Sequence, residues 1–129
     1  MKSVFLFLFA SLLVLSGCST EQNNAVGYRQ LSIQEALDLM VSEKDYIILD
    51  VRTPSEYNGG HIPSAINIPN ETIQMTENPQ LPDKNQLIFV YCRSGNRSKQ
   101  ASAKLAQMGY THIVEIGGIN AWPGEIVTQ

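Results

Sequence analysis

The amino-acid sequence predicts a single α/β domain in which parallel strands alternate with helices. Its 129 residues leave room for one hydrophobic core. Hydrophobic residues make up 43% and charged residues 16%, which is typical of a globular protein and not of a disordered one. Short apolar runs alternate with segments that carry helix-capping signals, and this order favours strands covered on both faces and joined by right-handed crossovers. Acidic residues number 12 against 9 Lys and Arg, without a basic run, so no nucleic-acid partner is expected.

Helix-capping signals place the expected helices. Residues 32–35 (SIQE) match a capping box, and apolar side chains then recur on one helical face to about residue 43. Residues 53–56 (TPSE) match a second capping box with proline at the first helical position, which predicts a short helix. A third helix is expected to begin with Ser98 as its cap and to end at Gly109.

Four apolar runs are the expected strands. They are residues 46–51 (YIILDV), 65–68 (AINI), 87–91 (LIFVY) and 113–116 (IVEI). The longer runs are rich in β-branched and aromatic residues, which strands favour. After the last run, Gly117-Gly118 is expected to form a tight turn, and a short closing helix is expected around Ile119 to Trp122.

The first residues resemble an export signal. Lys2 precedes an almost uninterrupted apolar run of 12 residues from Val4 to Leu15. A membrane-spanning helix needs roughly 20 apolar residues, so the run predicts a signal peptide. Residues 15–18 (LSGC) resemble the lipobox of bacterial lipoproteins, which implies that Cys18 is acylated and becomes the first residue of the mature chain. The alternative is that Cys18 is an incidental residue of an ordinary signal peptide or short anchor.

On this interpretation the chain has three parts. Residues 1–17 are the lipoprotein signal peptide, residues 18–27 are the lipidated cysteine and a flexible polar tether, and residues 28–129 form the domain. Two or more acyl chains give lasting membrane attachment, so we expect a lipid-anchored protein of the bacterial cell envelope, facing the periplasm or the exterior. Cys92 is then the one remaining cysteine, and neither an intramolecular disulfide nor a zinc cluster is expected.

The segment CRSGNRS, which begins at Cys92, carries the expected chemistry. It follows a buried strand, and ligands of parallel α/β sheets bind beyond the carboxyl ends of the strands. Helix N-termini, converging backbone NH groups and neighbouring cations lower the pKa of a thiol, so Cys92 is expected to be a thiolate nucleophile. The residues expected to bind its substrate are Arg93, Ser94, Gly95, Asn96, Arg97 and Ser98. The alternative is an inert buried cysteine with both arginines in solvent.

Two reaction classes use a loop of this kind, cysteine phosphatases and sulfur transferases. In cysteine phosphatases, five residues separate the cysteine from an arginine that clamps the phosphoryl oxygens. Here Arg97 comes one residue earlier, and Ser98 stands at the phosphatase position. The shorter loop encloses a smaller space, which suits a terminal sulfur on the cysteine better than a tetrahedral phosphate. A cysteine-dependent phosphatase or arsenate reductase stays open as an alternative.

The chain closely resembles the rhodanese family of sulfurtransferases. The matching segments are residues 92–98 (CRSGNRS), 50–69 (DVRTPSEYNGGHIPSAINIP) and 117–122 (GGINAW). The resemblance implies a single rhodanese-like domain with a central, mainly parallel, five-stranded sheet flanked by helices. It also implies a Cys92 persulfide, which takes sulfane sulfur from thiosulfate or a related donor and gives it to a thiophilic acceptor such as cyanide or a thiol. No metal or organic cofactor is implied, and a non-enzymatic rhodanese-type protein-binding module is the second alternative.

Four further residues near the site are expected to be structural. Asp50 and Arg52 follow the first long strand, and we interpret them as an ion pair. Glu56 completes its capping box. His61 has the side chain of a catalytic base, yet the family match places it in a structural turn. In addition to these four residues, Trp122 is expected to pack against the core.

Overall fold

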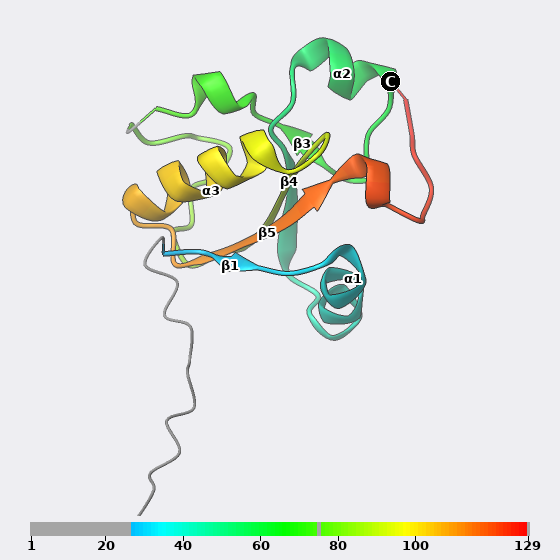
Figure 1. Ribbon diagram of the computed structural model, residues 1–129. Helices are drawn as coiled ribbons and strands as arrows, with labels where there is room; N and C mark the ends of the chain where they lie inside the picture. Colours follow the sequence, from blue (N-terminus) through cyan, green and yellow to red (C-terminus); the bar gives the residue numbers. More distant parts are fainter. Residues whose placement is uncertain (1–26, 75, 129) are drawn as a thin grey trace, which may run out of the picture.

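The computed structural model describes residues 27–74 and 76–128 of the chain (Figure 1). Its strands are β1 (Arg29–Gln30), β2 (Tyr46–Asp50), β3 (Ile66–Asn67), β4 (Leu87–Cys92) and β5 (His112–Gly118). Its helices are α1 (Ile33–Ser42), α2 (Pro54–Gly59) and α3 (Asn96–Gln107), with short 3-10 helices η1 (Asn70–Thr72) and η2 (Ile119–Ala121). The expected signal peptide and the expected lipidation site, Cys18, lie outside the described residues. Within the described ranges, no helix has both the length and the apolar character needed to cross a membrane.

The five strands form one parallel sheet in the order β1-β5-β4-β2-β3. This arrangement confirms the predicted α/β class and the five-stranded sheet, and every strand pair in it is parallel. The sequence did not indicate β1, because its residues Arg29 and Gln30 are polar and exposed. They become a strand only through their pairing with Val114 and Glu115 of β5.

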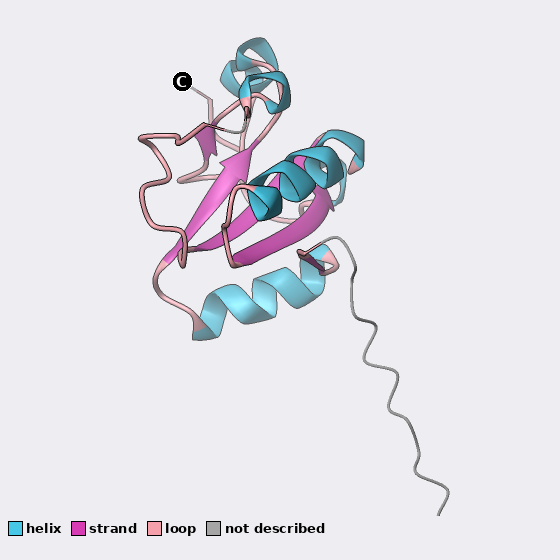
Figure 2. Cartoon of the chain, turned by 90° about the vertical axis from the view of Figure 1, so that its left-hand side faces the viewer, coloured by secondary structure: helices cyan, strands magenta, loops and turns pink. Residues whose placement is uncertain are grey.

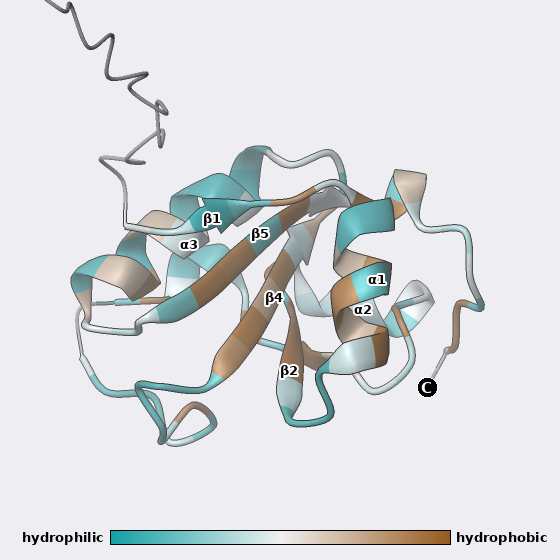
Figure 3. Ribbon diagram, turned by 90° about the horizontal axis from the view of Figure 1, so that it is seen from below, coloured by the Kyte–Doolittle hydropathy of each residue, from teal (hydrophilic) through white to brown (hydrophobic). Residues whose placement is uncertain are grey.

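Helices cover both faces of the sheet (Figure 2). Neighbouring side chains of β4 point to opposite faces, as they do in any strand. Phe89 packs with Ile33 and Ala36 of α1 on one face. Val90 packs in the cluster that contains Leu105 of α3 on the other face. Figure 3 shows the resulting hydrophobic centre along β2, β4 and β5. Each large apolar side chain buried there contributes about 1.5–3 kcal/mol.

Both predicted capping boxes are present. At the start of α1, the Ser32 hydroxyl accepts a hydrogen bond from the Glu35 backbone NH at 3.1 Å, and the Glu35 carboxylate accepts one from the Ser32 backbone NH at 3.0 Å. Thr53 and Glu56 form the same reciprocal pair at the start of α2. These local bonds satisfy NH groups that a helix start leaves free, which is why the sequence located both helices well.

Helix α3 begins three residues earlier than the sequence indicates. Its N-cap is Gly95, whose φ of 112° lies in the region that favours glycine. The chain therefore turns from β4 into the helix within a few residues. The prediction that Ser98 caps this helix is wrong, because Ser98 lies in the first turn and is fully buried.

Strand β5 continues through the two glycines that were expected to form a turn. Val90 pairs with Glu115, whereas Cys92 pairs with Gly118, so β5 has one residue more than β4 between these pairs. Such a bulge bends a strand and re-aims its side chains. The expected turn is therefore wrong, and the bulge brings the end of β5 against the loop that follows β4. The short closing helix is confirmed as η2.

Candidate active site

Two neighbouring strands end at the candidate active site. Cys92 is the last residue of β4, and Asp50 is the last residue of β2. Since β2 and β4 pair in parallel, their carboxyl ends lie at the same edge of the sheet, where ligands of such folds bind. Cys92 is only 1% exposed, so its sulfur lies beneath the loop and not on the surface.

The loop after β4 directs hydrogen-bond donors at this sulfur. The backbone NH of Gly95 donates to Cys92 Sγ at a distance of 3.0 Å. The hydroxyl oxygen of Ser98 lies 3.4 Å from the same sulfur. Helix α3 starts at Asn96, so the positive end of its dipole also lies next to the loop. Together these groups form a site for a negatively charged sulfur.

The donors outweigh the effect of burial on the thiol. Burial by itself raises the pKa of the Cys92 thiol, but the hydrogen bond between the thiol and the Ser98 hydroxyl and the hydrogen bonds from the backbone NH groups of Ser98, Gly95 and Ser94 lower it below its ordinary value of 9.0. A cysteine surrounded only by hydrocarbon would show the opposite shift. Because the thiolate is the nucleophilic form, this loop favours a reactive cysteine.

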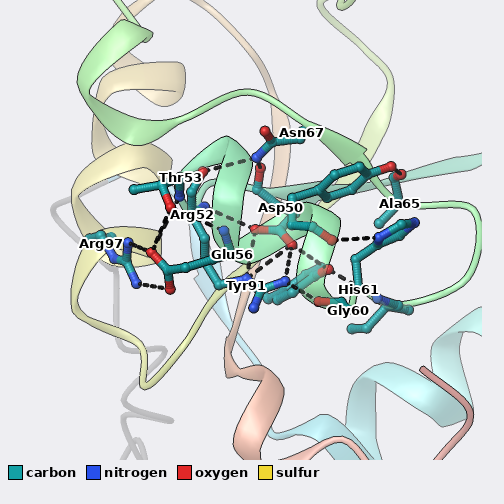
Figure 4. A network of polar contacts seen from close by, with 12 residues as sticks. Asp50, Arg52, Thr53, Glu56, Gly60, His61, Ala65, Asn67, Tyr91 and Arg97 are labelled. Carbon is teal, nitrogen blue, oxygen red and sulfur yellow. Dashed lines mark hydrogen bonds and ion pairs between the residues drawn. The ribbon is translucent and has the colours of Figure 1, made fainter. Parts of the chain in front are cut away.

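The two loop arginines differ in their surroundings. Arg97 forms a two-pronged ion pair with Glu56 of α2, in which Nη1 lies 2.7 Å from Oε1 and Nη2 lies 2.9 Å from Oε2 (Figure 4). The hydrogen bond from Arg97 lowers the pKa of Glu56 to about 2 from 4.5. The pair therefore stabilises the fold above about pH 4.5, and this contribution is lost as the pH falls toward 2. Arg93 is exposed, and its guanidinium has no ion-pair partner within residues 27–74 and 76–128.

Asp50 and Arg52 form the buried ion pair expected from the sequence. Arg52 Nη2 lies 2.6 Å from Asp50 Oδ2, and the same nitrogen donates to the Gly60 carbonyl at 2.7 Å (Figure 4). The Tyr91 hydroxyl donates to Asp50 Oδ2 at 2.7 Å. Burial raises the pKa of Tyr91 well above its ordinary value, so its hydroxyl stays protonated and remains a donor. The network ties the ends of β2 and β4 to the turn after α2.

His61 lies in that turn and makes structural contacts. Its Nδ1 is 2.8 Å from the Tyr57 carbonyl oxygen, and its ring stacks on the Tyr57 ring with the centroids 3.7 Å apart. Its backbone pairs with that of Val127. Trp122 is half-buried and packs at the margin of the core cluster on the α1 face of the sheet.

Sequence reasoning missed two features of the site. Glu115 of β5 is 3% exposed, and its Oε1 accepts hydrogen bonds from the Ser98 hydroxyl at 2.6 Å and from the Gly117 backbone NH at 2.7 Å. A charged residue inside the apolar run IVEI was the available signal, since buried carboxylates need partners. The pair of Glu56 with Arg97 joins residues 41 positions apart, and no local pattern indicates it.

A hollow of about 260 Å³ opens beside the loop. Arg93 of the loop forms part of its wall. The wall also contains Arg52 and Glu56 from the β2–α2 side, and Ile119 and Asn120 from η2. The exposed guanidinium of Arg93 makes this hollow a suitable place for a small anion. In the described part of the chain, no group of three or more His, Cys, Asp or Glu side chains is arranged to hold a metal ion.

Comparison with known proteins agrees with this geometry. Residues 32–125 match the family model of the rhodanese-like domain. The chain belongs to the rhodanese-like family. This rhodanese-like domain is 42% identical to the thiosulfate sulfurtransferase PspE of Escherichia coli over 71 residues, which are 55% of this chain and 68% of PspE.

Solved structures show the same fold. A rhodanese with anions from E. coli superposes on the rhodanese-like domain with a TM-score of 0.60 and 37% identity, covering 65% of this chain and 99% of that one. A rhodanese-related protein from Thermoplasma volcanium gives a TM-score of 0.66 and 30% identity, covering 79% of this chain and 100% of that one. The fold is therefore that of a single rhodanese-like domain.

Proposed function

We propose that this protein is a rhodanese-type sulfurtransferase in which Cys92 carries sulfane sulfur as a persulfide. The donor is thiosulfate or a related small anion, and the acceptor is a thiophile such as cyanide or a thiol. The observation that carries the proposal is the 3.0 Å hydrogen bond from the Gly95 NH to Cys92 Sγ. It supports an anionic sulfur at the end of β4 without any metal. The similarity to a thiosulfate sulfurtransferase supports the same chemistry.

The proposed cycle has two displacements at sulfur. The Cys92 thiolate attacks the outer sulfur of thiosulfate, a new S–S bond forms, and the S–S bond of thiosulfate breaks so that sulfite leaves with the electron pair. The acceptor then attacks the outer sulfur of the persulfide, and the bonding pair returns to Cys92 as thiolate. The inward-pointing NH groups stabilise the negative sulfur at both stages.

Arg93 is the proposed counter-ion of the donor. Its guanidinium is exposed in the wall of the hollow, whereas Arg97 is neutralised by Glu56. The structure thus favours separate roles for the two arginines. Arg93 attracts the sulfonate oxygens of thiosulfate, and Arg97 fixes the start of α3 to α2.

Intact-mass measurement tests the proposed persulfide. The protein is the full chain carrying Cys18→Ser, purified in detergent, in which Cys92 is the one remaining cysteine. After incubation with thiosulfate, we expect the mass to rise by one sulfur atom and to fall back when cyanide is added. Cys92→Ser in the same background is expected to show no added sulfur, since a serine hydroxyl cannot form the persulfide.

Two results would overturn this function. Hydrolysis of an aryl phosphate by the folded protein, with no sulfur added from thiosulfate, would indicate a cysteine phosphatase. A folded protein that neither gains sulfur nor hydrolyses the phosphate, and whose function in cells is retained in Cys92→Ser, would indicate a protein-binding module.

Replacing Arg93 tests the donor site. Arg93→Gln is expected to raise the KM for thiosulfate about tenfold with little change in kcat, because it removes a charge that binds the donor before and during the reaction. Lys99→Gln is the matched control, since Lys99 is also an exposed cation near the start of α3. Equal effects of the two variants on KM would show that Arg93 acts only through the overall charge of the protein.

We also propose that Cys18 carries acyl chains that hold the protein to the bacterial cell envelope, facing the periplasm or the exterior. The sequence LSGC after an apolar run supports this location. Cells grown with radioactive palmitate are expected to label the protein, and Cys18→Ser is expected to lose the label. Label retained in the variant would contradict the anchor.

A further inference from the structure

The Ser98 hydroxyl lies between two acidic groups that are both buried. Its oxygen is 3.4 Å from Cys92 Sγ and 2.6 Å from Glu115 Oε1. Ser98 is 0% exposed, Cys92 is 1% exposed and Glu115 is 3% exposed. The three residues come from α3, β4 and β5, so the fold itself connects the thiol to a carboxylate through one hydroxyl group.

Ser98 has a single hydroxyl proton but several possible acceptors for it. Besides the sulfur and the carboxylate, the carbonyl oxygens of Gly95 and Gly117 lie 2.9 Å and 3.4 Å from its oxygen. Hydrogen bonds to an ionised carboxylate are short and strong, and the 2.6 Å contact with Glu115 is the shortest of the four. While Glu115 is ionised, the Ser98 proton therefore points at the carboxylate and the thiol donates its own proton to Ser98.

We propose that Cys92, Ser98 and Glu115 form a proton relay that sets the protonation state of the sulfur. The Cys92 thiol proton passes to Ser98 Oγ while the Ser98 hydroxyl proton passes to Glu115 Oε1. A thiol and a carboxylate thereby become a thiolate and a carboxylic acid, with no proton gained or lost. Ser98 then donates to the thiolate. This inference rests on the proposed function, since it takes Cys92 as the nucleophile.

Burial explains why the two acids are coupled. Two negative charges joined by one hydroxyl in a site without solvent repel each other, so the pair favours one shared negative charge. The backbone NH of Gly117, at the β5 bulge, donates to Glu115 Oε1 at 2.7 Å and holds the carboxylate toward Ser98. Glu115 acts on the sulfur through Ser98, so it is a positioning residue.

The other charged groups around the relay are either ion-paired or exposed. Arg97 is paired with Glu56, whose pKa is lowered to about 2 by that hydrogen bond, and Arg93 is exposed on the loop. The Asp50 carboxylate is paired with a buried guanidinium. The packed elements also carry Lys99 and Lys104 on α3 and Arg29 on β1. Glu35 and Asp38 on α1 and His112 on β5 are exposed.

The ultraviolet absorbance of the thiolate, measured against pH, tests the relay. The protein is the full chain with Cys18→Ser, and the same chain with Cys92→Ser supplies the blank for tyrosine absorbance. We expect the thiolate to appear in two steps separated by more than about one pH unit, because the pair loses its two protons one after the other. Glu115→Gln is expected to show one step, at least about one pH unit below the upper step of the parent.

Two further variants complete the experiment. Ser98→Ala is expected to lose the lower step, because the thiol can no longer pass its proton to the carboxylate. Glu43→Gln removes an exposed carboxylate at the end of α1 and is expected to keep both steps. One step at the same pH in the parent and in folded Glu115→Gln would overturn the relay. If Glu115→Gln does not fold, two steps retained in Ser98→Ala would overturn it.

The readout is independent of sulfur transfer. Thiolate formation needs no donor, so a protein that fails to take sulfur from thiosulfate but shows the two steps would contradict the proposed function and support the relay. A protein that takes sulfur from thiosulfate but shows one step in every variant would support the proposed function and contradict the relay.

Discussion

Asp50→Ala is expected to lower the free energy of unfolding by about 3–5 kcal/mol, which is the usual cost of leaving a buried charge without its partner. Asp50 is 0% exposed and Arg52 is 6% exposed, so water cannot take the place of either partner when the other is removed. The carboxylate also accepts a hydrogen bond from the Tyr91 hydroxyl, which would lose its acceptor. Urea unfolding, followed by the fluorescence of Trp122, the one tryptophan of the chain, measures the loss.

Two variants show whether the unpaired cation causes this loss. Asp38→Ala removes an exposed carboxylate on α1 and is expected to change the stability by no more than about 0.5 kcal/mol. Replacing Arg52 by methionine in the Asp50→Ala background removes the stranded charge, so stability is expected to recover in part. An Asp50→Ala loss as small as that of Asp38→Ala would show that the ion pair is not important for stability.

Gly118→Ala is expected to displace the loop that holds Cys92. A Cβ at this position would overlap the carbonyl group of Arg93 and would come within 2.7 Å of Ser94 Cα. These are backbone atoms, so the loop or the end of β5 must move. Strain of this kind costs about 1–3 kcal/mol. A shift of about 1 Å near a reacting atom lowers rates about 100-fold, so persulfide formation is expected to fall by about that factor.

Thermal unfolding and the rate of sulfur gain from thiosulfate measure the two effects of Gly118→Ala. The matched control is Gly59→Ala at the end of α2, where an added Cβ meets no atom within 4 Å. This control is expected to keep the stability of the parent. If Gly118→Ala kept the stability and the rate of the parent, the close approach of β5 to the loop would not matter for the site.

The helices and the longer strands were predicted well because their signals are local. Ser32 and Glu35 satisfy each other's backbone groups within one helical turn, and Thr53 and Glu56 do the same. The short strand β1 was not predicted, because only pairing with β5 makes Arg29–Gln30 a strand. The β5 bulge also escaped prediction, since a bulge is defined by the register of two strands and not by either strand alone.

The sequence indicated most residues of the candidate site but not the contacts between residues that are distant in the chain. The sequence indicated Cys92, the surrounding loop and the Asp50–Arg52 pair, and the structure brings all of them to the carboxyl edge of the sheet. It did not indicate that Glu56 neutralises Arg97, which leaves Arg93 as the available cation of the loop. Ion pairs between distant residues depend on where the backbone places each side chain, and no local pattern specifies that.

The sequence by itself determined the α/β class, the two capped helices and a cysteine in the turn between a strand and a helix. These features follow from the side-chain periodicity and capping bonds of neighbouring residues. Only the tertiary structure decided that Ser98 contacts both Cys92 and Glu115. That contact needs the register of β4 with β5 and the seating of α3 on the sheet, which long-range packing sets.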